Sequence, residues 1–219
     1  RQAGAVAGAG AMHILAVFAH PVRESFTGAL LDAFLEGAAE AGHSAEIADL
    51  YREGFEPRFQ PEDFAQFKAG AMPEAIREEQ ARVDRAEGLA FVFPVWWWSF
   101  PAILKGWIDR VMSQGWAYDF SPARSRGQLA DRPVLLLGSA GSREGTYRKY
   151  RYDDAMAIQI DVGILGYCGL RNVSTRILHD VNDDAALLAV HLAEARRCGR
   201  EFGRWPHPAT VKPGAVREA

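Results

Sequence analysis

The sequence predicts one α/β domain built on a doubly wound, five-stranded parallel sheet with helices on both faces. Short apolar runs alternate along the chain with longer segments whose apolar residues repeat at helical spacing. Strict alternation of strands and helices implies parallel strands joined by right-handed crossovers. The length of 219 residues suits a single domain, and 48% hydrophobic with 24% charged residues is ordinary for a globular protein.

Five apolar runs are the expected strands. His13–Ala19 is apolar without interruption, as expected of a strand that is buried on both faces. Gly88–Phe93 and Pro133–Gly138 have the same character, while Ser44–Leu50 and Arg171–Leu178 are weaker candidates. Five such strands favour the order 2-1-3-4-5, which is the flavodoxin-like arrangement, and a nucleotide-binding Rossmann half is the competing arrangement.

Helical periodicity occupies the segments between these strands. The first helix ends at Gly42, a residue suited to a left-handed cap, and the third begins with a proline at its first turn. The last begins with two aspartates and ends with arginines, which matches the helix dipole at both ends. The expected helices are Phe26–Ala41, Glu74–Glu87, Pro101–Gln114, Ala155–Tyr167 and a last helix from Asp183 to Arg200.

The two ends of the chain differ from the rest. Residues 1–11 are mostly small, and we expect a disordered arm or an artificial extension there. The single domain should occupy residues 12–205, followed by a loose tail over residues 206–219.

Composition narrows the classes of partner. A net charge of −3 with interspersed signs lacks the basic stripe that nucleic acid requires, and no apolar run approaches the ~18 residues of a membrane span. Cys168 and Cys198 lie far apart, which favours reduced thiols in the cytoplasm over a disulfide. The sequence has no metal-ligand spacing of Cys and His, no H-E-x-x-H and no G-x-S-x-G, so we expect no metal site and no standard hydrolase.

The ligand site is expected at the carboxyl edge of the sheet. In the order 2-1-3-4-5 the crevice lies between the first and third strands, where the strand order reverses. The segments that can line it are His20–Thr27, Pro94–Phe100 and Ser139–Tyr147.

The first segment lacks both G-x-G-x-x-G and a P-loop lysine. It places Arg23, Ser25 and Thr27 at a helix N-terminus, where free N–H groups and the helix dipole favour an anion. The alternative is that Ser25 is only a helix cap and that His20 is an exposed loop residue.

The second segment contains three consecutive tryptophans, Trp96, Trp97 and Trp98. Neighbouring residues of a strand point to opposite faces, and Pro94 interrupts the strand, so the three rings cannot all be buried in the sheet. Planar side chains beside backbone N–H groups suit a flat aromatic ligand with polar atoms along one edge. A hydrophobic plug and a dimer contact are the alternatives.

The third segment, Ser139–Tyr147, is rich in glycine and serine. It allows the backbone to approach a ligand closely and offers the phenol of Tyr147 as a donor, although such segments are often only turns.

Residues 93–118 (FPVWWWSFPAILKGWIDRVMSQGWAY) strongly resemble the NAD(P)H:quinone oxidoreductase family, the flavodoxin-like group of DT-diaphorase and bacterial quinone reductases. Ala19-His20-Pro21 through Ser25-Phe26, Asp49-Leu50-Tyr51 and the stretch from Gly163 to Gly169 are similar to further parts of that family. The matches occur in order over about residues 12–178.

The resemblance implies a flavin, usually FAD with FMN as the alternative, NAD(P)H as co-substrate, and a homodimer with its active site at the interface. The phosphate and ribitol would be held by His20, Ser25, Phe26 and Thr27, and the isoalloxazine by Pro94, Val95, Trp96, Trp97 and Trp98. Ser139, Ala140 and Gly141 would contact the pyrimidine side, with Tyr147 as the catalytic donor near O2. Trp98, together with Tyr118 and Phe120 of the partner subunit, would line the substrate pocket.

One position departs from the family pattern. Animal members carry a histidine six residues after the tyrosine, whereas this chain has Asp153. A carboxylate would be repelled by an anionic flavin, so the role of that histidine is not transferred, and Arg148, Lys149 or Arg151 could replace it.

The expected function is a two-electron, ping-pong transfer of hydride from NAD(P)H to a quinone or similar acceptor, with azo, nitro or free-flavin reduction as alternatives. Two other classes stay open. One is a flavin-binding ancillary subunit of a potassium-efflux system. The other is a one-electron flavodoxin carrier, against which the modest charge of −3 argues.

Overall fold

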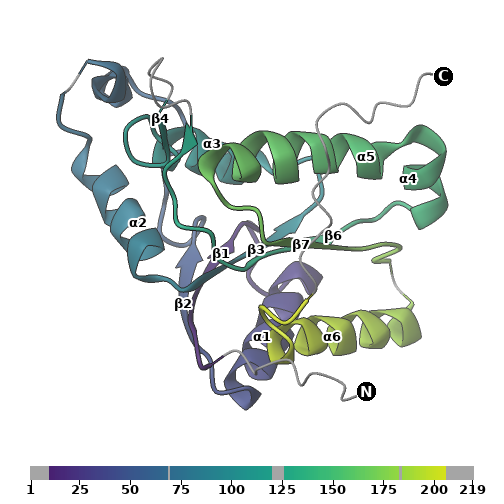
Figure 1. Cartoon of the computed structure of the whole chain (residues 1–219). Helices are drawn as coiled ribbons and strands as arrows, with labels where there is room; N and C mark the ends of the chain where they lie inside the picture. Colours follow the sequence, from purple (N-terminus) through teal and green to yellow (C-terminus); the bar gives the residue numbers. More distant parts are fainter. Residues whose placement is uncertain (1–9, 69, 120–125, 183, 206–219) are drawn as a thin grey trace, which may run out of the picture.

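The computed structural model describes residues 10–68, 70–119, 126–182 and 184–205. The predicted arm over residues 1–11 lies outside this range apart from its last two residues, and the predicted tail over residues 206–219 lies wholly outside it. The described residues form three layers, with a sheet between two layers of helices (Figure 1).

The sheet has five parallel strands in the order β2-β1-β3-β6-β7. Counted along the chain without the short β4 and β5, this is the order 2-1-3-4-5, and the predicted fold class is confirmed. The strands are β1 (His13–Phe18), β2 (Ser44–Asp49), β3 (Gly88–Pro94), β6 (Val134–Ser139) and β7 (Val173–Leu178).

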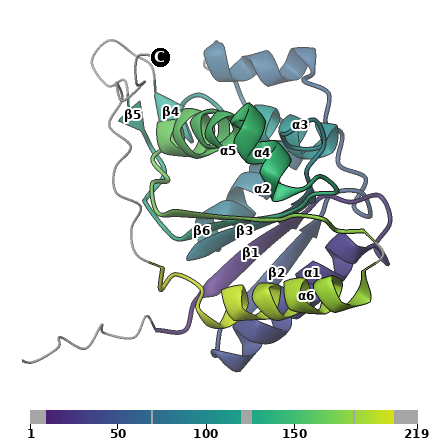
Figure 2. The same ribbon diagram turned by 90° about the vertical axis from the view of Figure 1, so that its right-hand side faces the viewer.

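Helices cover both faces, as Figure 2 shows most directly. One face carries α1 (Phe26–Glu40) and α6 (Ala185–Arg200). The other carries α2 (Glu74–Arg85), α3 (Ala102–Val111), α4 (Glu144–Tyr150) and α5 (Tyr152–Met156), which continues into the π-helical stretch η2 (Ala157–Gly166).

Three segments differ from the sequence expectation. The third predicted loop is cut short, because α4 starts at Glu144 and places Tyr147 on a helix. The helix expected from Ala155 already begins at Tyr152, and it widens to π geometry, a form frequently found at functional sites. Two further elements have no counterpart in the expected set: the 3₁₀ helix η1 (Pro61–Phe67) and the hairpin of β4 (Tyr118–Asp119) with β5 (Arg126–Gly127).

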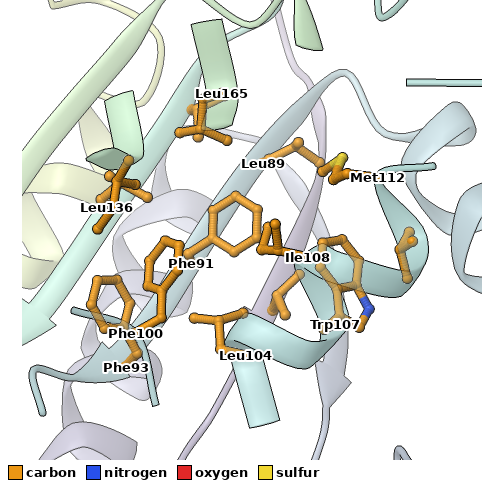
Figure 3. Packing of buried hydrophobic residues seen from close by; sticks show 14 of the residues in the cluster. Leu89, Phe91, Phe93, Phe100, Leu104, Trp107, Ile108, Met112, Leu136 and Leu165 are labelled. Atoms are coloured by element: carbon orange, nitrogen blue, oxygen red, sulfur yellow. The ribbon is translucent and has the colours of Figure 1, made fainter. Parts of the chain in front are cut away.

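The central strand β3 explains why one face of the sheet binds α3 so closely. All seven of its residues are buried, and successive side chains point to opposite faces. Phe91 and Phe93 therefore pack beneath Phe100, Leu104 and Trp107, as Figure 3 shows. Residues 90 and 92 pack into the opposite cluster, beneath α1 and α6. Both faces of β3 are thus committed to the core, which leaves its end as the place for a ligand.

Helices α1 and α6 approach each other through glycine. A Cβ atom built on Gly37 would lie 1.9 Å from the carbonyl oxygen of Arg196, and one on Gly199 would lie 2.1 Å from that of Phe34. Both distances are far below van der Waals contact, and the obstacle is backbone in each case. The two helices can keep their present spacing only while these positions lack side chains.

We therefore expect Gly37→Ala to lower the free energy of unfolding by about 1–3 kcal/mol, because the added methyl group forces the helices apart. The matched control is Gly145→Ala on α4, where an added Cβ meets nothing within 4 Å. The control should be neutral or stabilising by up to about 1 kcal/mol, since alanine favours helix. Urea denaturation of the three proteins tests this, and equal unfolding midpoints for Gly37→Ala and the wild type would contradict it.

Candidate functional site

A pocket of about 270 Å³ opens at the carboxyl edge of the sheet, where the segments after β1, β3 and β6 meet. Nine of the ten described residues that line it belong to the site predicted from sequence; Val181 is the tenth. The nine are His20, Ser25, Phe26, Thr27, Pro94, Val95, Trp96, Ser139 and Gly141. The three predicted segments therefore converge on one hollow.

The first segment presents hydroxyl groups and a helix N-terminus to this pocket. Ser25 is the N-cap of α1, and its Oγ accepts a hydrogen bond from Gly28 N at 3.2 Å. His20 folds back on its own loop, with Nδ1 2.8 Å from the carbonyl oxygen of Val22. The positive end of the α1 dipole lies beside these groups and favours an anion.

Arg23 does not supply a free charge to the pocket. Its guanidinium forms an ion pair with Asp32 and also donates to the carbonyl oxygen of Gly28 at 3.2 Å. The hydrogen bond to Asp32 raises the pKa of Arg23. Arg23 therefore holds its loop against α1, and its charge is paired with Asp32 instead of being free for an anion, as the sequence had suggested.

A buried hydroxyl pair joins the first segment to the third. Thr27 Oγ1 and Ser139 Oγ lie 2.7 Å apart, and both residues are buried. The first turn of α1 is thereby tied to the last residue of β6, across the end of β3. Both residues line the pocket, so this bond joins two of the segments that form it.

The tryptophan segment forms a tight two-residue turn. Trp96 N donates to Ser99 O at 3.3 Å, and Ser99 N donates to Trp96 O at 3.1 Å. Between them Trp97 and Trp98 both have positive φ, 52° and 53°, the signs of a type I′ turn. Each non-glycine residue in the left-handed region costs about 1–2 kcal/mol, so the turn is strained, and such outliers cluster at functional sites.

The three indole rings have different surroundings. Trp96 lines the pocket beside His20, with ring centroids 6.4 Å apart. Trp97 is 87% exposed, whereas Trp98 is half-buried. Within the described ranges no hydrogen bond uses the backbone N–H of Trp97 or Trp98. The turn therefore offers two unused donors next to the pocket, although neither of these two residues is part of its lining.

One helical segment holds the turn from outside. The ring of Trp98 stacks on Tyr152, with centroids 3.9 Å apart and planes 23° from parallel. Ser99 Oγ lies 2.9 Å from Gln159 Oε1, to which it donates. Neither Tyr152 nor Gln159 carried a signal in the sequence, because Tyr152 precedes the segment expected to be helical and Gln159 meets a residue far away in the chain.

Tyr147 is only 2% exposed and does not line the pocket. Its ring meets His179 edge-on at 4.5 Å between centroids. Burial, with a smaller contribution from the carboxylate of Asp153, raises the pKa of Tyr147 to about 12. The phenol therefore keeps its proton at neutral pH and can only act as a neutral donor or acceptor.

The basic residues near Tyr147 have local partners. Arg148 pairs with Glu144, and Arg151 Nε lies 2.9 Å from Asp154 Oδ2. Lys149 lies over the ring of Tyr150, 5.0 Å from its centroid. None of the three lines the pocket.

The segment after β7 reaches the site through hydrogen bonds to Ala140, the residue that follows β6. Ala140 N donates to Leu178 O at 2.8 Å, and Ala140 O accepts from Val181 N at 3.1 Å. These bonds extend the pairing of β6 and β7 beyond the sheet and bring Val181 to the pocket. A Cβ on Gly141 would meet nothing within 4 Å, so the backbone there is open to a ligand.

Tyr118 lies at the other end of the sheet. It pairs with Gly127, and a Cβ on Gly127 would come within 2.2 Å of the carbonyl carbon of Cys168, five residues before β7 begins. The pocket lies beyond the last residues of the strands, so one chain does not bring Tyr118 to it. Phe120 lies outside the described residues.

The two cysteines lie outside the pocket lining. Cys168 and Cys198 are free and buried, and burial raises the pKa of each thiol to about 11. The described residues contain no group of three or more His, Cys, Asp or Glu that could hold a metal ion. Among them no helix has the length and apolarity to cross a membrane.

Three comparisons place the chain among known proteins. The model of the family described as having a flavodoxin-like fold matches residues 12–198. An uncharacterized NAD(P)H oxidoreductase of Haemophilus influenzae is 33% identical over 183 residues, covering 82% of this chain and 90% of that protein. Ribosyldihydronicotinamide dehydrogenase [quinone] of Rattus norvegicus is 32% identical, over 75% of this chain and 80% of its own. The solved structure of the NAD(P)H:quinone oxidoreductase from Methanothermobacter marburgensis is 37% identical with a TM-score of 0.80, covering 88% of this chain and 97% of that one.

The strain of the tryptophan turn can be measured. We expect Trp97→Asn to be more stable than Trp97→Ala by about 1 kcal/mol, because asparagine tolerates the left-handed region and alanine does not. Both variants remove the same exposed ring, so the difference between their free energies of unfolding reports the cost of the backbone conformation. Urea unfolding measures the difference, and an alanine variant at least as stable as the asparagine variant would show that the turn is unstrained.

Proposed function

The chain belongs to the family with the flavodoxin-like fold, and we propose that it is a flavin-dependent NAD(P)H oxidoreductase that transfers two electrons to a quinone-like acceptor. The observation that carries this proposal is the pocket at the reversal of strand order, bordered by a strained turn with two unused N–H donors. The names of the relatives from Rattus norvegicus and Methanothermobacter marburgensis support a quinone as acceptor.

The chemistry of the lining fits the parts of a flavin. Hydroxyl groups of Ser25, Thr27 and Ser139 suit a polyol and its phosphate, and the N-terminus of α1 adds a positive dipole end. The unused N–H groups of Trp97 and Trp98 suit the polar edge of a planar ring. About 270 Å³ is slightly less than whole-ligand sites enclose, so the ring would extend toward the exposed tryptophans.

When bound, the flavin would supply the hydride chemistry, and the protein would supply orientation and electrostatics. The tryptophan turn would orient the ring, and its indoles would shield one side from water. We propose that NAD(P)H and the acceptor occupy the same place in turn, which is a ping-pong order.

Tyr147 lies outside the pocket lining, and the proposal gives it the role of a neutral hydrogen-bond donor to the part of the flavin that would extend beyond the pocket. Its raised pKa of about 12 keeps the proton on the phenol throughout the physiological range. A fixed donor beside a developing negative charge lowers the barrier of the step that creates the charge. Asp153 would add repulsion there, so the donor would have more charge to offset than in relatives with a histidine.

The proposal includes an assembly and a cofactor type. Tyr118 lies at the end of the five-stranded sheet that is opposite to the pocket of the same chain. We therefore propose a homodimer in which Tyr118 and Phe120 reach the pocket of the other copy. The resemblance to quinone reductases favours FAD, with FMN as the alternative. Free, buried thiols are compatible with the cytoplasm, which we propose as the location.

The function is tested by purifying the protein, recording its visible spectrum and identifying the released cofactor. We expect a yellow protein that oxidises NAD(P)H when a quinone is supplied. Azo dyes, nitroaromatics and free flavin serve as competing acceptors in the same assay. A colourless chain that does not take up FAD or FMN would overturn the proposal.

Tyr147→Phe should lower the rate of flavin reduction by NAD(P)H by about tenfold or more, because it removes one oriented donor and keeps the buried ring. Stopped-flow loss of flavin absorbance measures the rate. Tyr150→Phe, which removes a hydroxyl from an exposed tyrosine of the same helix, is the control and should be unaffected. An unchanged rate in Tyr147→Phe would remove Tyr147 from the mechanism.

A further inference from the structure

Tyr152 lies where two separate parts of the proposed site meet. It is the first residue of α5 and follows Arg151, whose φ of 58° turns the chain between α4 and α5. After this change of chain direction, the ring of Tyr152 faces α4 and the Trp96–Ser99 turn.

Two ring contacts define this position. Tyr152 stacks on Trp98 at 3.9 Å between centroids and meets Tyr147 edge-on at 6.0 Å, with planes 84° apart. Trp98 follows β3, whereas Tyr147 belongs to α4 after β6. Among the described residues, Tyr152 alone is in ring contact with both.

The stack matters because the backbone conformation of Trp98 is energetically costly. Its φ of 53° lies in the left-handed region, which a bulky residue occupies only when its surroundings impose it. Ser99 and Gln159 bond at 2.9 Å next to the stack, so the same helical segment contacts the turn at two adjacent residues. The π-helical stretch η2 begins directly after α5, so it starts between Tyr152 and Gln159.

We propose that Tyr152 is a positioning residue for the reaction, holding the Trp98 turn and Tyr147 in one fixed mutual arrangement. This inference rests on the proposed function of those two residues. The planar ring carries the role, because the Tyr152 hydroxyl makes no hydrogen bond within the described part of the chain. We therefore expect phenylalanine at position 152 to keep the positioning role and leucine to lose it.

The experiment compares Tyr152→Leu, Tyr152→Phe and the control Tyr51→Leu with the wild type. Tyr51 follows β2, is exposed and lies outside the pocket lining, and its ring contacts none of Trp98, Tyr147 and Tyr152. Near-UV circular dichroism of the cofactor-free protein reports the Trp98 stack, titration with FAD gives the dissociation constant, and stopped flow gives the reduction rate of the loaded enzyme. Tyr152→Leu should alter the near-UV spectrum, weaken FAD binding and slow reduction by about tenfold to a hundredfold, the cost of a small misplacement. The other two variants should match the wild type.

Several results would overturn the role. A Tyr152→Leu protein with an altered near-UV spectrum but wild-type reduction rate would make the stack merely structural. Equal losses of FAD affinity and reduction rate in Tyr152→Leu and Tyr152→Phe would show that the hydroxyl, and not the ring, carries the role. A wild-type chain that binds no flavin overturns the proposed function and this role together, whereas a flavin-loaded wild type unaffected by Tyr152→Leu overturns the role alone. Should Tyr152→Leu fail to fold, Tyr152→Met retains an apolar side chain without a planar ring and undergoes the same comparison.

Discussion

The parallel arrangement of β1, β3 and β6 is the constraint on which the rest of the molecule depends. Parallel strands end at the same edge, so the segments that follow them are brought together however far apart they lie in sequence. The register aligns Pro94 with Ser139, and the ladder continues one step further through Val95 N to Ser139 O. The Thr27–Ser139 hydroxyl pair then joins the remaining segment at the same level. A pocket at this place is thus a property of the sheet, and the side chains decide only what it can bind.

Much of the fold could be predicted because its signals are local and strong. Uninterrupted apolar runs such as Gly88–Phe93 mark strands buried on both faces, and the strand order follows from their alternation with helices. The convergence of His20–Thr27 with the tryptophan segment could be predicted for the same topological reason. Whether these residues bind a flavin stays a prediction, supported by the lining of the pocket and by the names of relatives.

The parts that sequence reasoning missed depend on geometry without a periodic signal. Glycine and serine over residues 141–145 are typical of a loop, yet α4 begins at Glu144, where Glu144, Arg148 and Lys149 have good helix propensity. Val181 reaches the pocket only because β7 extends its pairing past Leu178 to Ala140. The positive φ angles of Trp97 and Trp98 contradict the preference of tryptophan itself, so no propensity could have indicated them. The tertiary contacts beside them also lack a local signal, since Trp98 stacks on Tyr152 and Ser99 donates to Gln159.

The turn at Trp96–Ser99 has a consequence for the thermodynamics of ligand association. A flexible loop must give up conformational entropy when a ligand orders it, and that loss weakens binding. Here the backbone is already confined, by reciprocal hydrogen bonds within the turn and by aromatic stacking outside it. The entropy is lost during folding and not again on association, so the amide dipoles are preorganised. A ligand that fits them should bind with little rearrangement of the chain, and one that does not fit gains nothing from induced closure of this loop.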